Sequence, residues 1–259
     1  TVEIPSGHFL TRTLFLKSNV NLHLHFGAEL LGSTDLDSYH KVFPELKGKE
    51  SPALIFARGV ANIAITGSGT INGQGAHQNF QHGNDSKGGP RRPKIIYFIG
   101  CNNVRVQDVT LRNSAYWTQD YEKCNGVIVR GVKVYSHANW NNDGLDIDSR
   151  NVVVSDCYID CDDDALCLKS DTDTPCENVT VTNCVLKSNC NAIKFGTSSY
   201  SGFKNVTISN CTIDRASEDH IRQWYKNYPW IGTKHKTVVA GIALESVDGG
   251  IIENVSISD

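Results

Sequence analysis

Apolar and polar residues alternate along this chain in short stretches that repeat. One stretch occurs four times, and its copies, which align without gaps, begin at Asp143, Asp164, Asn191 and Ala240. A second stretch, Asn-Val-x-Val or Asn-Val-x-Ile, recurs every 27 residues, at Asn151, Asn178 and Asn205. Alternation predicts strands with one buried face. A repeat of this length built from short strands predicts a solenoid.

The second pattern extends toward both ends of the chain. Asn, Gly and Asp residues between the strands leave no room for crossover helices. We therefore predict an all-β protein, a right-handed parallel β-helix, in which equivalent residues of successive coils stack about 4.8 Å apart in columns. Further copies of the pattern begin at Asn19, Asn62, Asn103, Gly126 and Asn254.

The repeats predict a single domain over residues 1–259. The chain starts without an initiator methionine and stops just inside another repeat, so we expect an excerpt from a longer β-helix. Residues 215–239 break the repeat and are predicted to leave the coil as a loop.

Composition argues against several partners. A formal net charge of −3 and a pI near 6.3 give no electrostatic attraction to a nucleic acid or a membrane surface. No apolar run is long enough to span a bilayer. The histidines show no HxxxH zinc spacing, and His23 and His25, on one face of an early strand, are expected to be satisfied locally. We predict no metal and no cofactor, and the sequence does not indicate the oligomeric state.

The cysteines follow the columns. Cys157, Cys184 and Cys211 occupy one repeat position, where earlier coils carry Val109 and Val132. They are therefore predicted to pack as small apolar residues in the core. Nine cysteines with no paired CxxC spacing do not predict a zinc site.

Acidic residues at the strand starts are the main candidates for chemistry. Asp143, Asp164 and Asn191 begin the same strand on three successive coils, and Asp162 and Asp163 directly precede Asp164. Adjacent acids repel one another unless a cation or a raised pKa relieves them. Such a cluster indicates either a functional site or a solvated acidic turn, and Asp143 one coil away favours the site.

These residues resemble the polygalacturonases of glycoside hydrolase family 28. Asn141-Asn142-Asp143-Gly144 is similar to that family's Asn-Thr-Asp-Gly motif, and Asp163-Asp164 to its paired aspartates. The resemblance implies hydrolysis of an O-glycosidic bond in a pectic polysaccharide or oligosaccharide, without a metal, by a secreted or periplasmic enzyme. It also places Asn142 beside the substrate.

The resemblance implies a role for each aspartate. Asp163 would be the general acid, and Asp143 and Asp164 would hold and deprotonate the attacking water, with inversion at the anomeric carbon. Inversion is associated with carboxyls about 6.5–9.5 Å apart, the order of distance that we expect from neighbouring coils. We further expect Asp162 and Asp164 to raise the pKa of Asp163.

Two departures from the family concern the substrate. The family's Gly-His-Gly becomes Cys190-Asn191-Ala192, and its carboxylate-binding Arg-Ile-Lys becomes Ala243-Leu244-Glu245. Losing two cations and gaining an anion should weaken galacturonate binding, so plain homogalacturonan is not the expected substrate. Lys194, in the column of Asp146, would either contact a sugar carboxylate, neutralise the acid cluster or pair with Asp146.

Aromatic residues add candidates for sugar stacking. The loop predicted at residues 215–239 contains Trp224 and Arg222, which would supply a stacking surface and a cation, or would only pack the loop onto the coil. Trp140, just before the Asn-Asn-Asp motif, and Trp117, at a coil edge, are better placed for stacking.

Two other hypotheses remain open at this stage. In a polysaccharide lyase, Asp146, Asp162 and Asp164 would bind calcium, and Lys169 or Lys194 would be the base. Alternatively, a noncatalytic β-helix would bind carbohydrate without cleaving it.

Overall fold

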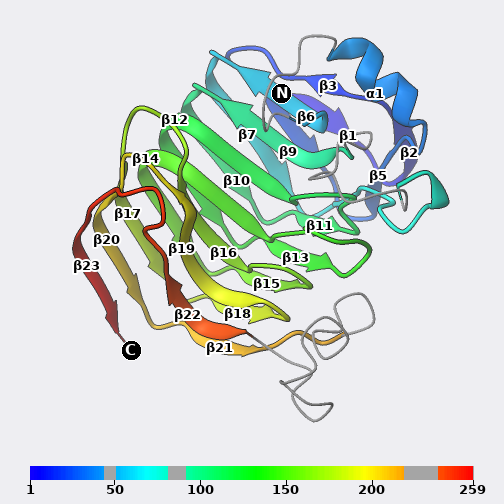
Figure 1. Cartoon of the computed structure of the whole chain (residues 1–259). Coiled ribbons are helices and arrows are strands. Elements are labelled where there is room, and N and C mark those ends of the chain that lie inside the picture. Colours follow the sequence, from blue (N-terminus) through cyan, green and yellow to red (C-terminus); the bar gives the residue numbers. More distant parts are fainter. Residues whose placement is uncertain (44–50, 81–91, 219–238, 259) are drawn as a thin grey trace.

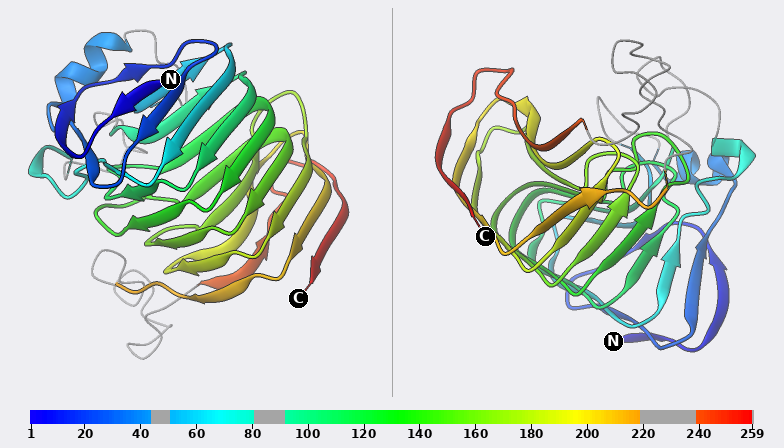
Figure 2. Two further views of the ribbon diagram at one scale, coloured as in Figure 1. Left: turned by 180° about the vertical axis from the view of Figure 1, so that it is seen from behind. Right: turned by 90° about the horizontal axis from the view of Figure 1, so that it is seen from below.

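The computed structural model, which describes residues 1–43, 51–80, 92–218 and 239–258, is a right-handed parallel β-helix. Its strands pair in parallel and stack coil upon coil from the N-terminal to the C-terminal end (Figure 1). The views in Figure 2 show the two termini at opposite ends of this stack. The predicted fold class is confirmed.

Each full coil contributes to three faces. What we call the asparagine face contains β1 (Val2–Ile4), β4 (Asn21–Leu24), β7 (Ala61–Gly67), β10 (Asn102–Gln107), the second halves of β12 (Gln119–Arg130) and β14 (Leu145–Ser155), β17 (Cys176–Thr182), β20 (Phe203–Ser209) and β23 (Ile252–Ser258). The aspartate face contains β3 (Leu14–Phe15), β6 (Ala53–Arg58), β9 (Lys94–Ile99), the first halves of β12 and β14, β16 (Leu166–Ser170), β19 (Asn191–Ser199) and β22 (Ala240–Leu244).

The long strands β12 and β14 belong to both of these faces and join them into one sheet. The third face is a separate sheet. It contains β2 (Gly7–Thr11), β5 (Ala28–Gly32), β8 (Thr70–Asn72), β11 (Thr110–Arg112), β13 (Lys133–Ser136), β15 (Tyr158–Cys161), β18 (Val185–Ser188) and β21 (Thr212–Arg215).

An asparagine ladder explains the repeated Asn of the sequence. The side-chain amide of Asn178 donates to Asn151 at 3.1 Å, and Asn205 donates to Asn178 at 3.0 Å. These residues have φ near +55°, a left-handed conformation that asparagine tolerates better than most residues do. Each Asn thus turns the chain and links its coil to the preceding one.

The interior is filled by the apolar residues of the alternating pattern. Val109 and Val132 are buried, as are Cys157 and Cys184 at the same repeat position, and Cys211 is half-buried. All nine cysteines are free. The prediction that the repeated cysteines pack as core residues is therefore confirmed.

Helical structure is confined to the N-terminal part of the described chain. It comprises α1 (Leu36–Val42) and the 3-10 turn η1 (Gln78–Phe80). No helix in the described ranges has the length and apolar character needed to cross a membrane. Strand β21 ends at Arg215 and β22 begins at Ala240, so no strand is described over the predicted loop. Residues 219–238 of this loop, with Arg222 and Trp224, lie outside the described residues.

Candidate active site

The aspartate face carries the column that the repeats predicted. Leu145 on β14 pairs with Leu166 on β16, which puts Asp143 and Asp164 at equivalent positions two residues earlier. Gly144 N donates to Asp164 O at 2.8 Å, and Ala165 N donates to Asn191 O at 2.9 Å, so Asn191 continues the column. Asp143, Asp164 and Asn191 are all buried.

Gly144 permits the close approach of these coils. A Cβ at this position would lie 2.3 Å from Ile159 Cγ2 and 2.7 Å from the Ala165 carbonyl oxygen. Any side chain would therefore push β14 away from β16 and separate the aspartates. The glycine after Asp143 in the motif has a steric cause.

The carboxyl groups are closer together than the sequence led us to expect. One oxygen each of Asp143 and Asp164 and the Cys167 sulfur lie within 4.8 Å of one another, and so do the corresponding atoms of Asp163, Asp164 and Cys190. These closest oxygens do not show the expected spacing of about 6.5–9.5 Å. Asp143 and Asp164 are equivalent residues on adjacent coils, which are separated by one strand spacing of about 4.8 Å, whereas Asp163 and Asp164 are consecutive in the chain.

Asp164 is held as an anion. The Asn191 amide group donates to its Oδ1 at 2.6 Å, the Asn191 backbone N–H donates to the same oxygen at 3.2 Å, and Lys194 Nζ is 3.2 Å from Oδ2. Burial alone would raise the pKa of Asp164, but Lys194, Lys169 and the Asn191 hydrogen bond hold it below its ordinary value. Asn191, at the family's histidine position, thus orients and stabilises a carboxylate.

Lys194 neutralises the acid cluster, which is one of the roles predicted for it. Its Nζ also lies 3.9 Å from Glu245 Oε2. The alternative pairing of Lys194 with Asp146 is wrong, although both residues occupy one column, because Lys194 pairs with Asp164 and Asp146 pairs with Lys169, at 3.1 Å.

The pKa of Asp143 is shifted in the opposite direction to that of Asp164. Burial, followed by the charges of Asp146 and Asp163, raises the pKa of Asp143 well above its ordinary value, although Lys169 opposes this at 3.9 Å. Burial also raises the pKa of Asp146 to about 7. A raised pKa is therefore present at Asp143, and the raised pKa expected for Asp163 stays a prediction. Environments that push neighbouring carboxyls in opposite directions are typical of acid–base pairs.

A pocket of about 300 Å³ adjoins the aspartates on the N-terminal side. Trp117 forms one wall, with the Nζ atoms of Lys94 and Lys169 each 4.4 Å from its ring centre. Lys94 is fully buried and forms an ion pair with Asp120. Lys169 connects the pocket to the aspartates. The residues that line the pocket are Lys94, Tyr97, Trp117, Asp120, Glu122, Lys123, Asp148, Lys169, Asp171 and Thr172.

Lys94 and Asp120 were not predicted from the sequence, and Lys169 was predicted only as the possible base of a lyase. Asp120 could have been found, because it lies opposite Asp146 in the same column that contains Lys194. The repeat pattern does not indicate the position of Lys94, since its side chain reaches Asp120 from the preceding coil.

The remaining predicted substrate contacts divide into two groups. Trp140 is 42% exposed, and its carbonyl accepts a hydrogen bond from buried Arg92, which also holds Asn141 in the motif turn. Glu245 is partly exposed beside Lys194. Asn142, by contrast, is fully buried, and its amide group has no hydrogen-bond partner among the described residues. Direct substrate contact by Asn142 would require its surroundings to open.

The calcium group of the lyase hypothesis is not brought together. Asp162 Oδ1 accepts a hydrogen bond from Asn189 at 3.1 Å. At the aspartates, the groups of possible ligand atoms within 4.8 Å of one another contain neither Asp146 nor Asp162, as far as the chain is described. His137, six residues before Asp143, instead contacts Asp160 at 2.9 Å.

Comparisons with known proteins identify the fold and the family. A probable polygalacturonase of Vitis vinifera is 32% identical over 183 residues, which are 66% of this chain but only 37% of that protein. An exopolygalacturonase of Thermotoga maritima has the same fold, with a TM-score of 0.74 and 23% identity over 99% of this chain and 67% of its own. The polygalacturonase of Erwinia carotovora gives a TM-score of 0.68 and 20% identity over 97% of this chain and 70% of its own. The model of glycosyl hydrolases family 28 matches residues 1–252, and the chain belongs to this family.

Proposed function

We propose that this chain forms the catalytic β-helix of a glycoside hydrolase that cleaves O-glycosidic bonds in a pectic polysaccharide. The observation that carries the proposal is the buried column in which Asp164 is held ionised while its neighbour Asp143 has a raised pKa. Hydrolysis of a glycoside needs both a proton donor and a carboxylate.

The cluster retains a proton that the general acid can use. Asp143 and Asp163 repel each other electrostatically, and burial of Asp143 disfavours full ionisation of the group. Interacting carboxyls titrate together, so the proton belongs to the cluster rather than to one residue. By its position in the family motif, Asp163 delivers this proton to the glycosidic oxygen.

The environment of Asp164 favours water activation over covalent attack. Asn191 binds Oδ1 and Lys194 lies at Oδ2, so both oxygens are engaged and the carboxylate is a weak nucleophile. Such a carboxylate can still accept a proton from water. We therefore propose inversion, with Asp164 and Asp143 holding the attacking water, although the short carboxyl spacing is nearer to the values associated with retention.

The charges around the site disfavour plain homogalacturonan. Ala243 and Glu245 occupy the positions of the family's cation pair, and the pocket beside Trp117 is lined by three lysines and four acidic residues. Lys94 and Lys169 are already paired with Asp120 and Asp146. A uronate would meet little uncompensated positive charge, so we infer a branched or mixed pectic chain that presents a neutral sugar here.

Neither lysine considered as the base of a lyase is neutral. Burial would lower the pKa of Lys169, but the negative charges of Asp146 and Asp143 raise it well above its ordinary value. The neighbouring Cys167 adds no negative charge, because burial raises the pKa of its thiol well above its ordinary value. Asp164 has the same effect on Lys194. Both amines are protonated at neutral pH and cannot abstract a proton.

The activity test is a product screen on homogalacturonan and rhamnogalacturonan fragments, with NMR of the first anomer released. Asp143→Asn, Asp163→Asn and Asp164→Asn should each lower kcat by about 10²–10⁴-fold. Asp214→Asn, on the third face, is the matched control. Full activity in any of the three variants would contradict the assigned roles, and a retained anomer would contradict inversion.

A further inference from the structure

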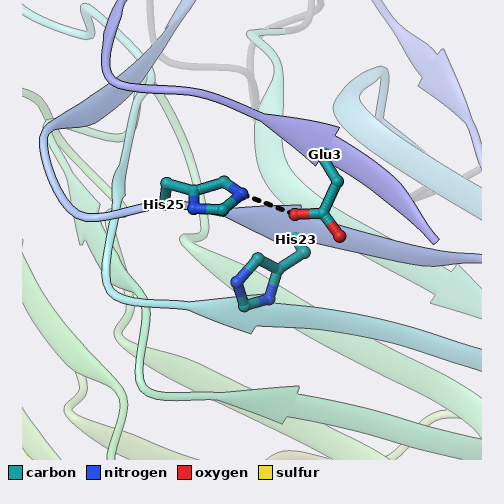
Figure 3. A group of neighbouring side chains, drawn as sticks. All are labelled: Glu3, His23 and His25. Atoms are coloured by element: carbon teal, nitrogen blue, oxygen red, sulfur yellow. Dashed lines mark hydrogen bonds and ion pairs between the residues drawn. The ribbon is translucent and has the colours of Figure 1, made fainter.

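A second group of ligand-type side chains lies on the asparagine face, away from the aspartates. Glu3 on β1 is paired directly with His23 on β4, and His25 follows two residues later on the same side (Figure 3). One carboxylate oxygen and one nitrogen from each ring lie within 4.8 Å of one another. His25 Nε2 and Glu3 Oε2 are 2.6 Å apart. Two adjacent coils thus contribute to one cluster.

His23 is oriented by hydrogen bonds that leave one ring nitrogen available. Its Nδ1 is 2.8 Å from Thr66 Oγ1, and the Thr66 hydroxyl group is 3.0 Å from Asn21 Oδ1. Because Thr66 donates its proton to Asn21, its oxygen accepts from His23, which assigns the proton to Nδ1. Nε2 then carries the lone pair of the neutral ring. Metal-binding histidines are typically fixed in this way, by a hydrogen bond from the other ring nitrogen.

From this arrangement we propose that Glu3, His23 and His25 bind a divalent transition-metal ion, of which Zn²⁺ is the representative. Two imidazoles and one carboxylate suit such ions, whereas Ca²⁺ and Mg²⁺ prefer oxygen ligands alone. Ligands about 2.0–2.2 Å from a tetrahedral ion stand roughly 3.3–3.6 Å apart, so small side-chain rotations suffice. The fourth position is left for water.

The ion links the first two coils of the described stack. Glu3 and His25 are about half exposed, so the site is open to solvent and needs no entry path. Strand β1 (Figure 1) is followed directly by β4 in the strand order of the described sheet, so the two coils are neighbours. An ion that binds the folded coil and not the unfolded chain stabilises it by mass action.

The sequence predicted no metal here and expected His23 and His25 to be satisfied locally. Each does have a partner, but Thr66 is 43 residues away and Glu3 is on another coil. The cluster exists only through the register of β1, β4 and β7, and therefore no spacing motif marks it.

Calorimetric titration of the whole chain with ZnCl₂ in a non-chelating buffer at pH 7.5 tests the proposal. We expect one saturable site, a higher Tm with Zn²⁺, and no competition from Mg²⁺ or Ca²⁺. His23→Ala and His25→Ala should abolish both effects. Thr66→Val, which removes the orienting hydrogen bond, should weaken binding about 10-fold. His8→Ala is the matched control, because His8 contacts Glu29 at 2.9 Å without a second imidazole.

Two further measurements accompany the titration. Circular dichroism without Zn²⁺ checks that the variants are folded, and Co²⁺ absorption in the visible range reports four-coordinate binding in the wild type. A wild type without stoichiometric binding would overturn the site. So would binding that persists unchanged in both folded histidine variants, because the ion would then lie elsewhere.

Discussion

Glu245→Gln removes the charge that, in our proposal, keeps uronates away from Lys194. Glu245 Oε2 is 3.9 Å from Lys194 Nζ, and its side chain is 37% exposed. Two unit charges at this distance interact by about 4 kcal/mol at an effective dielectric constant near 20. Solvent exposure reduces the net value to about 1 kcal/mol. A substrate carboxylate that no longer competes with Glu245 should therefore gain roughly five- to tenfold in kcat/KM.

The assay compares initial rates on polygalacturonate and on rhamnogalacturonan oligosaccharides. The gain should appear mainly on polygalacturonate and shrink at high salt, because the interaction is partly screened. Glu253→Gln is the matched control, since Glu253 lies 3.6 Å from Lys204 on the asparagine face. An unchanged polygalacturonate rate in Glu245→Gln, or efficient hydrolysis of this polymer by the wild type, would contradict the role assigned to Glu245.

Two further predictions concern charge, and a third concerns metal dependence. Burial raises the pKa of Asp148 to about 7, so this residue contributes stability at pH 4 that is lost as the pH rises toward 7; Asp148→Asn should flatten that part of a plot of Tm against pH. Lys194→Met should move the acid limb of the kcat/KM profile to higher pH, because the cation that lowers the pKa of Asp164 is removed, whereas Lys187→Met should leave the profile unchanged. Activity should survive EDTA and yield no ultraviolet-absorbing product; calcium-dependent formation of such a product would instead identify a lyase.

The columns of the fold were predictable because the repeat determines register. Once the stretches that begin at Asp143, Asp164, Asn191 and Ala240 are aligned, parallel pairing puts them one above another, and the hydrogen bonds between coils follow. The asparagine ladder has the same origin. Periodic sequence therefore determines which backbone positions are neighbours, even when they are more than 20 residues apart.

Side-chain partners were less predictable, because a long side chain can reach either of two coils. The sequence placed Lys194 in the column of Asp146, yet its ammonium group lies beside Asp164, one coil nearer the N-terminus. Lys169 likewise reaches back from β16 to Asp146 on β14. Rotamers and local charge, rather than the repeat, decide these pairings.

The two lysines have related consequences for the site. Lys194, with Asn191, favours the ionised form of Asp164, whereas burial outweighs the weaker contact between Lys169 and Asp143. Because the aspartates occupy equivalent positions on one strand type, their backbones do not distinguish them. The difference comes from what the next coil supplies: an amide and an ammonium in direct contact with Asp164, but the acidic residues Asp163 and Asp164 and a more distant ammonium, that of Lys169, near Asp143. Unequal neighbours in a regular stack thus give otherwise equivalent carboxyls different protonation states, which acid–base hydrolysis requires.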